Sequence, residues 1–392
     1  MNHVSESPCS ATLLTPAGRG AIATLAVFGP DAARIVGRRF APRRAVDLET
    51  APVGRILFGN WLPNSGPGEE IVVCRRADDE WEIHCHGGRS AAEAILQGLA
   101  ADGARLADAP AWLQRHASDR LAAEARLALG AAPTERTAII LLDQYRGALR
   151  RELEIARAAV DQGALERAAA SLSRLAAMSR VGLHLTQPWR VVVAGPPNAG
   201  KSSLVNAILG YSRSIVFHRP GTTRDVVAAP TALDGWPVEL FDTAGLRAGG
   251  DAIESEGVAR ARAQMHQADL VLLLFDATNG WPESHRQLAA EWPQSLVVGN
   301  KADLLRDESP AAAWQLTTSA LTGQGLAELL DTIVRRLVPV SPQPGEAVPF
   351  SPEHITALHA AQTALATHNP ISAATILAQL VSPTARDRTA RA

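Results

Sequence analysis

Hydrophobic positions divide the chain into stretches of different periodicity. Over about the first 115 residues, short β-like runs (ATLLTPAGRGAIATLAVFG, VGRILFGNWL, EEIVVCRR and WEIHCHGG) predict strands, and segments such as SAAEAILQGLAADGA predict one or two helices. From about Ser118, runs rich in Ala, Leu and Arg have helical spacing, with breaks near Gly130–Pro133 and Gln162–Gly163. The pattern indicates an α+β region followed by a helical region.

The pattern changes again after Gln187. From there to about Val340, β-branched apolar runs alternate with helical segments, which is typical of an α/β domain with a parallel sheet. A Pro-rich stretch over 338–352 predicts a linker, and Ser351 and Pro352 predict the N-cap and first residue of a last helix. If that helix packs on the first helical block, the α/β segment is an insertion in a helical domain.

Composition narrows the class of protein. The chain of 392 residues is 46% hydrophobic and 20% charged with a formal net charge of −2, as in globular multidomain proteins. It has no apolar stretch of the roughly 20 residues that a membrane helix needs, and its N-terminus has no signal-peptide pattern. Three cysteines cannot form a disulfide framework. We therefore expect a cytoplasmic protein without a membrane partner, in which any nucleic-acid contact is local.

Lysine is almost absent from the sequence. Of the 38 basic residues, only Lys201 and Lys301 are lysines, which a compositional drift towards arginine explains. Lysine and arginine differ in shape, hydration and donor geometry. The two surviving lysines are therefore candidates for positions where arginine cannot serve.

Lys201 lies in a phosphate-binding motif. A predicted strand ends at Ala194, and Gly195-x-x-x-x-Gly200-Lys201-Ser202 then leads into a predicted helix. Lys201 is expected to act in catalysis as a compact cation at the β- and γ-phosphates, and Ser202 is expected to bind Mg²⁺. Backbone N–H groups at a helix start favour phosphate. The predicted phosphate contacts are Asn198, Ala199, Gly200, Lys201, Ser202 and Ser203.

Lys301 lies in a base-recognition motif, NKAD at 300–303, at the end of another apolar run. Ligands of open α/β sheets bind at this end of the strands. Asp303 can accept both N1–H and the 2-amino group of guanine, whereas adenine has no matching donors. Asn300 is expected to tie this loop to the phosphate loop, and the lysine stem to lie along the base. Ser319 and Ala320 are expected to back the base, so the sequence predicts GTP rather than ATP.

Two segments between these motifs complete a GTPase pattern. Asp242 ends a predicted strand in VELFDTAGLR and is expected to hold Mg²⁺ through water, and Asp234-Gly235 predicts the preceding hairpin turn. The segment PGTTRD supplies Thr223 as a second Mg²⁺ ligand when GTP is bound. The predicted contacts here are Gly221, Thr222, Thr223, Asp242, Thr243, Ala244 and Gly245. In this order, the elements resemble those of Ras-like GTPases.

Longer motifs resemble one family within that group. PNAGKSSLVNAI, GTTRD and DTAGLR, together with TPAGRGAIATLAVFGP and EIHCHGG, are similar to motifs of the MnmE (TrmE) family of tRNA modification GTPases. The resemblance implies a tetrahydrofolate-binding-like α+β domain over 1–116, a discontinuous helical domain over 117–186 plus 345–392, and an inserted P-loop GTPase domain over 187–340. It also implies a homodimer that acts with an MnmG (GidA)-like flavoprotein on the wobble uridine (U34) of tRNA.

The resemblance also assigns individual residues. Leu246 stands where many GTPases have a water-orienting glutamine, and Glu254 matches the catalytic glutamate of the family. Asn198 matches the ligand of a K⁺ ion that replaces an arginine finger, which gives it a catalytic role as well. Backbone carbonyls from Phe217 to Gly221 would complete the K⁺ shell. Glu82 matches a glutamate of the folate site.

Other residues depart from the family pattern. The Cys-Ile-Gly-Lys motif of the family is absent from the sequence, Ala26 replaces a folate-contacting arginine, and the helical segments contain no lysine. These departures weigh against one-carbon transfer to tRNA but leave the GTPase motifs intact. Three functions stay open: an MnmE-like GTPase, a GTPase switch without folate or tRNA chemistry, and a ribosome-assembly GTPase of the Era or Der kind.

Overall fold

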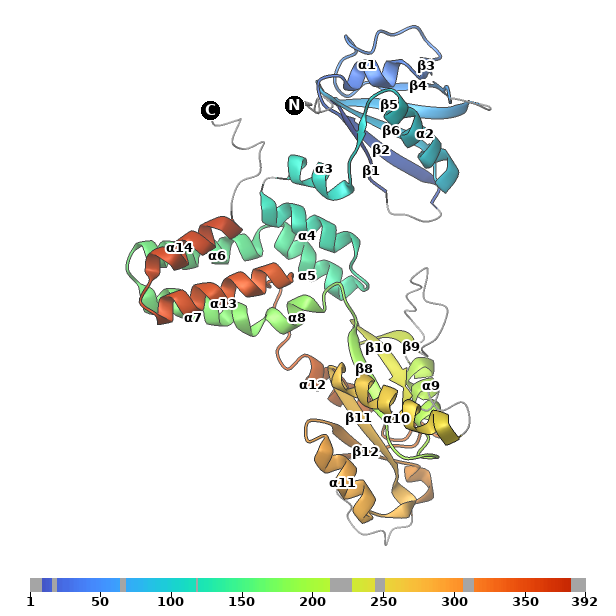
Figure 1. Cartoon of the computed structure of the whole chain (residues 1–392), viewed down its shortest axis with the longest axis vertical. Helices are drawn as coiled ribbons and strands as arrows, with labels where there is room; N and C mark the ends of the chain where they lie inside the picture. Colours follow the sequence, from blue (N-terminus) through green and yellow to red (C-terminus); the bar gives the residue numbers. More distant parts are fainter. Residues whose placement is uncertain are drawn as a thin grey trace. The chain divides into compact units, whose positions relative to one another are not determined.

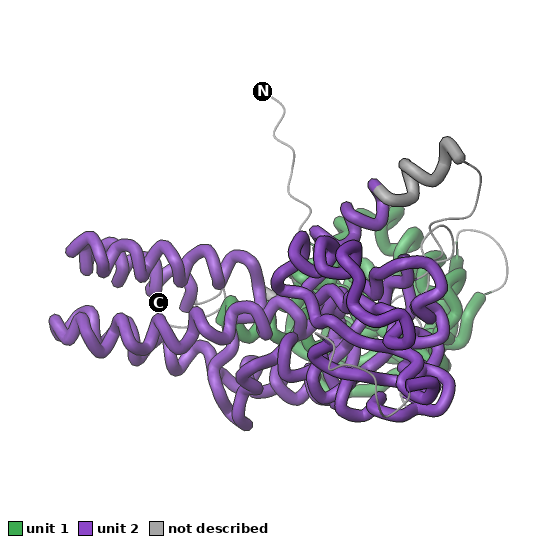
Figure 2. The backbone as a smooth tube through the Cα atoms, turned by 90° about the horizontal axis from the view of Figure 1, so that it is seen from below, with its two compact units in different colours: residues 1–130, 383–392 green, residues 131–382 purple. Residues whose placement is uncertain are grey.

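The structure, a computed structural model, describes residues 9–15, 20–63, 68–117, 119–211, 228–243, 251–305 and 314–381. The chain forms two compact units, one of residues 1–130 with 383–392 and one of residues 131–382 (Figure 2). Among the described helices, none has the length and apolar character needed to cross a bilayer.

The first unit is built on a seven-stranded sheet with the order β3-β4-β5-β6-β2-β1-β7. Neighbouring strands are antiparallel except β1 and β7, which are parallel. The strands are β1 (Ser10–Leu13), β2 (Ile22–Phe28), β3 (Phe40–Pro42), β4 (Ile56–Trp61), β5 (Glu69–Ala77), β6 (Glu80–His86) and β7 (Arg105–Leu106). The helices are α1 (Ala32–Gly37), α2 (Arg89–Ala101), α3 (Ala109–His116) and α4 (Arg120–Gly130).

Alternating side chains give this sheet two different faces. Leu25 on β2 and Ile83 on β6 belong to the larger core, which also contains Leu99 of α2. The intervening positions Ala26 and Phe28 pack with Trp112 of α3 in a smaller cluster. Because side chains of a strand point alternately to opposite faces, neighbouring apolar residues of β2 contribute to two separate clusters.

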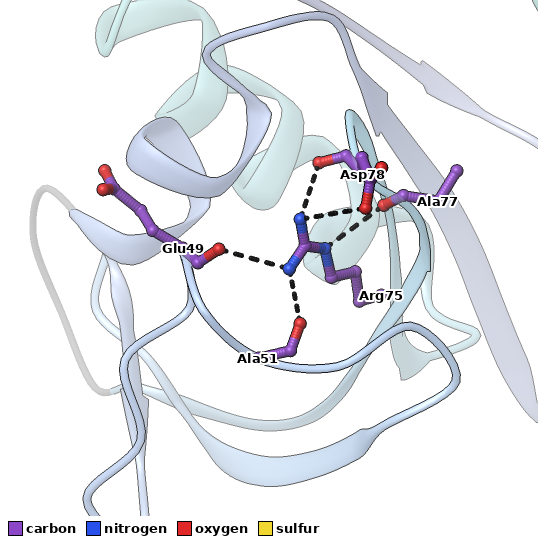
Figure 3. Close-up of polar contacts among 5 residues, drawn as sticks. All are labelled: Glu49, Ala51, Arg75, Ala77 and Asp78. Atoms are coloured by element: carbon purple, nitrogen blue, oxygen red, sulfur yellow. Dashed lines mark hydrogen bonds and ion pairs between the residues drawn. The ribbon is translucent and has the colours of Figure 1, made fainter.

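Arg75 joins two loops in the first unit (Figure 3). Its guanidinium donates hydrogen bonds to the carbonyl oxygens of Glu49 at 3.2 Å and of Ala51. It also donates to the carbonyls of Ala77 at 3.3 Å and Asp78 at 3.1 Å, next to the irregular register between β5 and β6. The guanidinium, whose side chain is only 13% exposed, thus ties the segment at residues 49–51 to the turn between β5 and β6.

Six helices of the second unit form a layer from two distant parts of the sequence. They are α5 (Glu135–Tyr145), α6 (Ala148–Asp161), α7 (Leu165–Ala177), α8 (Ser179–Leu183), α13 (Pro352–Ala366) and α14 (Pro370–Leu380). Figure 1 shows α13 and α14 lying beside α7 and α6, against which they pack. Ser351 caps α13 by accepting a hydrogen bond from the His354 amide, as predicted. The predicted helix breaks after Gly130 and near Gln162 are also confirmed.

The Pro-rich stretch that predicts a linker has no helix or strand before α13, and most of residues 339–345 are exposed, but its C-terminal end is packed. The Gln144 side chain donates to the Glu346 carbonyl at 3.0 Å and accepts from the Val348 amide at 3.1 Å. Val348 and Phe350 are buried. The connection from the α/β segment back to α13 is therefore held in place by the earlier helices.

The α/β segment contains a six-stranded sheet with the order β13-β12-β11-β8-β10-β9. All pairs are parallel except the β9–β10 hairpin. The strands are β8 (Trp189–Ala194), β9 (Ala228–Leu233), β10 (Trp236–Asp242), β11 (Leu270–Asp276), β12 (Leu296–Asn300) and β13 (Leu316–Thr317). The helices are α9 (Lys201–Tyr211), α10 (Asp251–His266), α11 (Glu283–Glu291) and α12 (Leu326–Leu337), with short 3₁₀ turns η2 (Ala277–Asn279) and η3 (Ala302–Leu304).

Both the α/β pattern and its hairpin are confirmed. Asp234 and Gly235 have φ angles of 47° and 74°, the left-handed geometry that tight hairpin turns require. Register pairs Asp242 with Val193 and Asp276 with Asn300, so the carboxyl ends of β8, β10, β11 and β12 lie at one edge. In open parallel sheets, this edge is where ligands bind.

An aromatic cluster packs beneath that edge. Ring centroids of Phe275 and His285 are 4.4 Å apart, and those of Trp281 and Trp314 are 4.8 Å apart. His285 is 9% exposed, and its Nδ1 has no hydrogen-bond partner among the described residues. Burial lowers the pKa of His285, although a backbone hydrogen bond at Gly280 and the charge of Asp276 act in the opposite direction.

This buried histidine predicts a pH-dependent stability. Because its folded-state pKa lies below the ordinary value of 6.5, the unfolded chain takes up the proton first as pH falls. The free energy of unfolding should therefore decrease below about pH 6.5, by up to ~1.4 kcal/mol per pH unit until the folded-state pKa is passed. Urea unfolding followed by tryptophan fluorescence measures it. His285→Phe should flatten the slope and the exposed His359→Gln should not; equal slopes in all three proteins would contradict the prediction.

Candidate nucleotide-binding site

The loop after β8 has a backbone shape that requires glycine at two positions. Gly195 and Gly200 have φ angles of 141° and 90°, and Asn198 has a φ of 61°. A Cβ on Gly195 would lie 2.0 Å from the Leu274 carbonyl oxygen, and one on Gly200 would lie 2.3 Å from Asn300 Nδ2. The two glycines of the motif are therefore required by close approach to neighbouring strands as well as by their own dihedral angles.

Lys201 begins α9 and is turned into the loop. Its side chain is almost completely buried, and Nζ donates to the carbonyl oxygens of Gly195 at 3.1 Å and Pro196 at 2.8 Å. The ammonium group thus lies beside the loop whose amides precede the helix. A compact cation here suits the charge of a nucleotide phosphate.

Oxygen ligands meet at the start of α9. Ser202 Oγ donates a hydrogen bond to the carboxylate of Asp242, which ends β10. The next residue, Thr243, donates from Oγ1 to the Val193 carbonyl at 3.0 Å and so fixes the end of β10 to β8. A hydroxyl and a carboxylate are hard oxygen donors of the kind that Mg²⁺ prefers, and the pair therefore fits the ion.

Asn300 connects the phosphate loop with two other loops. The side chain is buried, Nδ2 donates to the Ala199 carbonyl at 2.8 Å, and Oδ1 accepts from the Ala320 amide at 3.0 Å. The sequence predicted the link to the phosphate loop. Loss of this amide would leave the buried Ala199 carbonyl and the partly buried Ala320 N–H without these partners.

Lys301 has a partner that the sequence analysis missed. Its Nζ lies 2.6 Å from Oδ2 of Asp276 at the end of β11. Burial raises the pKa of Asp276, but hydrogen bonds from Lys301 and Thr278 outweigh burial and hold that pKa below its usual value. The sequence did contain a signal for Asp276. It is the last residue of the apolar run LVLLLFD, just as Asp242 is the last residue of VELFD.

The loop after β13 lies next to the base-recognition loop and contacts Asn300. Ser319 is buried, its Oγ accepts from the Thr322 amide at 3.1 Å, and Thr318 Oγ1 donates to the Gln324 carbonyl at 2.9 Å. Asp303 lies on η3 and is exposed. The structure thus gathers one group of sequence-predicted residues at a single edge: Asn198, Ala199, Gly200, Lys201, Ser202, Ser203, Asp242, Thr243, Asn300, Lys301, Asp303, Ser319 and Ala320.

Some predicted residues cannot be placed. Phe217, Gly221, Thr222, Thr223, Ala244 and Gly245 lie outside the described residues. Glu254 lies in α10, where the structure describes side chains only from residue 259 onward. Asn198 is described and its side chain is exposed to solvent.

Comparisons with known proteins agree with this geometry. Residues 190–301 match the family model described as a 50S ribosome-binding GTPase. The tRNA modification GTPase MnmE of Moorella thermoacetica is 34% identical over 81% of this chain and 79% of its own length. MnmE of Methylobacterium sp. is 36% identical over 82% of this chain and 81% of its own length.

The chain belongs to the MnmE family. As a member of it with a complete phosphate-binding loop, the protein is a GTP-hydrolysing enzyme that binds GTP and Mg²⁺. Among solved structures, Era in complex with MgGDPNP and nucleotides of 16S ribosomal RNA is 28% identical over 40% of this chain and 58% of that chain, with a TM-score of 0.31. The G domain of T. maritima FeoB is 27% identical over 38% of this chain and 99% of that chain, with a TM-score of 0.28.

In the first unit of this MnmE family member, several polar side chains cluster around Glu82. Glu82 lies 3.5 Å from Arg76 Nε and 3.5 Å from His84 Nε2, and His84 Nδ1 is 3.0 Å from Thr24 Oγ1. Register places Ala26 opposite Glu82, and Ala26 is completely buried. The glutamate that the resemblance assigns to folate is thus held by two basic side chains, and its neighbour on β2 supplies no charge.

Proposed function

We propose that this protein is a K⁺-stimulated GTPase of tRNA wobble-uridine modification that works as a homodimer with an MnmG-like flavoprotein. One observation carries the proposal: the similarity to tRNA modification GTPases extends over 81% of the chain, more than either unit alone contains. Similarity of the GTP site alone would equally suit a GTPase of another pathway.

The site residues supply positioning and charge for phosphoryl transfer. Lys201 and the loop amides bind the phosphates. Ser202, together with Asp242 through water, would hold Mg²⁺, which would supply positive charge at the phosphates. Leu246 cannot orient the attacking water. The resemblance to the family assigns Glu254 to that water. Its carboxylate would take the proton of the attacking water through a second water, as the water oxygen bonds to the γ-phosphorus and GDP leaves.

Asn198 is assigned to K⁺. It stands in the left-handed conformation with its side chain exposed at the phosphate loop, where an amide oxygen can serve as a cation ligand. The other proposed ligands, the carbonyls from Phe217 to Gly221, lie outside the described residues. A cation at this place would supply the positive charge that an arginine finger gives other GTPases.

GTP hydrolysis in K⁺ and in Na⁺ tests the assignment of Asn198. The wild type should turn over GTP at least about 10-fold faster in K⁺, because a missing charge at the transferring phosphoryl group costs that much or more. Asn198→Gly tolerates a φ of 61° and removes only the side chain, so it should abolish the difference. Asn279→Ala, an exposed residue on η2, is the control and should keep it. Equal wild-type rates in both salts would remove K⁺ from the proposal.

The role in tRNA modification needs its own experiment. Deletion of the gene should lower the fraction of modified wobble uridines in isolated tRNA, measured by nucleoside analysis, and expression of the chain should restore it. Unchanged wobble uridines in a strain with no other MnmE would contradict the proposal. Cross-linking of the purified chain, alone and with its own organism's flavoprotein, tests the two partners.

A second candidate function is favoured by one observation in the first unit. Ala26 is buried against Phe28 and Trp112 where the resemblance places a folate-contacting arginine. A GTPase switch without one-carbon chemistry would therefore retain the nucleotide site and lose the folate site. Titration with a tetrahydrofolate derivative separates the candidates: binding that Glu82→Gln weakens supports the tRNA-modifying enzyme, and no binding together with unchanged tRNA supports the switch.

A further inference from the structure

Asp276, which belongs to none of the GTPase motifs, holds the base-recognition loop through Lys301. Its Oδ2 receives the Lys301 ammonium at 2.6 Å, and its Oδ1 accepts from Thr278 N at 3.0 Å and Thr278 Oγ1 at 2.6 Å. Both carboxylate oxygens are thus engaged, and the side chain is only 15% exposed. A carboxylate fixed by three donors has little freedom to rotate, so the position of the ammonium is fixed with it.

Lys301 transmits this restraint to the residues that follow it. The lysine has a φ of 65° and a ψ of 38°, a left-handed conformation that a residue other than glycine adopts only when its surroundings hold it there. It directly precedes η3, which carries Asp303. The Ala302 amide donates to the Thr318 carbonyl at 3.0 Å, which fixes the same turn from the opposite side. The start of η3 is therefore held at Lys301 by Asp276 and at Ala302 by the loop after β13.

Asp276 also lies beside Asn300 in the sheet. The two residues are register partners at the ends of β11 and β12, and η2 contacts η3. Asn300 fixes the base loop to the phosphate loop, whereas Asp276 fixes the lysine stem that is expected to lie along the base. The two side chains act on different parts of the loop.

We propose that Asp276 is a positioning residue for guanine recognition, which holds Lys301 and thereby the turn that presents Asp303 to the base. The proposal rests on the assignment of Asp303 to guanine in the GTP site. It makes the end of β11 a further contributor to the nucleotide site, beside the phosphate loop, Asp242, the NKAD motif and the loop after β13. It also predicts that changes at Asp276 alter base selectivity more than phosphoryl transfer.

Nucleotide affinities of Asp276→Asn test the proposal in the full-length chain. Affinity for GDP should fall about 10-fold, the effect of losing one charge-assisted hydrogen bond. Affinity for IDP, which has no 2-amino group for Asp303, should fall less, so the ratio of the two dissociation constants should shrink. The KM for GTP should rise while kcat changes less than twofold. Asp331→Asn, the same substitution at an exposed position on α12, should leave all three quantities unchanged.

A double-mutant cycle with Lys301→Met shows whether Asp276 acts through the lysine. Methionine keeps an unbranched apolar stem but has no ammonium group, so Asp276→Asn should then weaken GDP binding no further. Fully additive effects of the two substitutions would overturn the proposal. Thr278→Val removes one donor to the carboxylate and should shift the GDP-to-IDP ratio in the same direction by a smaller amount, which keeps the test available if Asp276→Asn fails to fold.

The outcomes also separate this proposal from the assignment on which it rests. If Asp303→Asn lowers GDP affinity strongly and Asp276→Asn leaves the GDP-to-IDP ratio unchanged, the positioning role is wrong and the guanine contact stands. If Asp303→Asn has no effect on GDP affinity, the guanine contact itself is wrong. A uniform loss of affinity for both nucleotides in Asp276→Asn, with a lower unfolding temperature, would indicate a structural role only and overturn the proposal.

Discussion

Lys201→Arg should lower single-turnover GTP hydrolysis by about 100-fold or more. The Lys201 side chain is buried, with its ammonium 3.1 Å and 2.8 Å from the carbonyl oxygens of Gly195 and Pro196. A guanidinium is planar and wider than an ammonium, so it cannot occupy the same place without moving the loop. The comparison with Lys201→Ala shows how much of the effect is loss of charge and how much is misfit.

An exchange between arginine and lysine at an exposed position, Arg262→Lys, provides the control. Arg262 pairs with Glu291 at 3.1 Å on the surface of the α/β segment, and both side chains are more than half exposed. Arg262→Lys should therefore leave hydrolysis within about twofold of the wild type. If Lys201→Arg also hydrolysed GTP at nearly the wild-type rate, the scarcity of lysine in this chain would have no functional meaning at position 201.

Asp303→Asn should change the base specificity of the site from guanine to xanthine. The carboxylate can accept N1–H and the 2-amino group of guanine, whereas an asparagine presents one acceptor and one donor, which match N1–H and the 2-oxo group of xanthine. Affinity for GTP should fall by about 1000-fold or more, since a hydrogen-bonding site discriminates by 10⁴–10⁵ against an unmatched partner in the strongest cases. Binding and hydrolysis of XTP should rise by a similar factor.

Competition of labelled GDP with GTP, XTP and ATP measures this exchange directly. Asp331→Asn should keep the wild-type order of affinities, because Asp331 is exposed on α12. A variant that loses GTP binding without gaining XTP would indicate that the substitution damages the loop, and a variant that still prefers GTP would contradict the assignment of Asp303.

The local motifs of the site were predictable because each depends on a short segment. Gly195, Gly200 and Lys201 occur at fixed spacing between a strand and a helix, and the backbone angles that this loop needs can be met only by glycines at those places. The hairpin at Asp234-Gly235 and the cap at Ser351 are likewise encoded by neighbouring residues. Such features rest on sequence-local sterics and hydrogen bonds.

Asp276 could not be assigned in the same way. Its role depends on the parallel pairing of β11 with β12, which brings it next to Asn300 and within reach of Lys301, 25 residues away. An aspartate after an apolar run is common, and the sequence does not say which neighbouring strand it meets. The burial of His285 was missed for the same reason, since its ring packs on Phe275 of β11.

The sequence by itself determined the nucleotide motifs, the alternation of strands and helices that contains them, and the resemblance to the MnmE family. Only the tertiary structure decided that α13 and α14 pack on α7 and α6, that Gln144 holds the Pro-rich stretch, and that a carboxylate from β11 anchors Lys301. The physical reason is the distance along the chain between the residues that interact. Turn angles, caps and glycine loops are set by neighbours in the chain, whereas partners for buried polar groups are chosen by the packing of segments far apart in sequence.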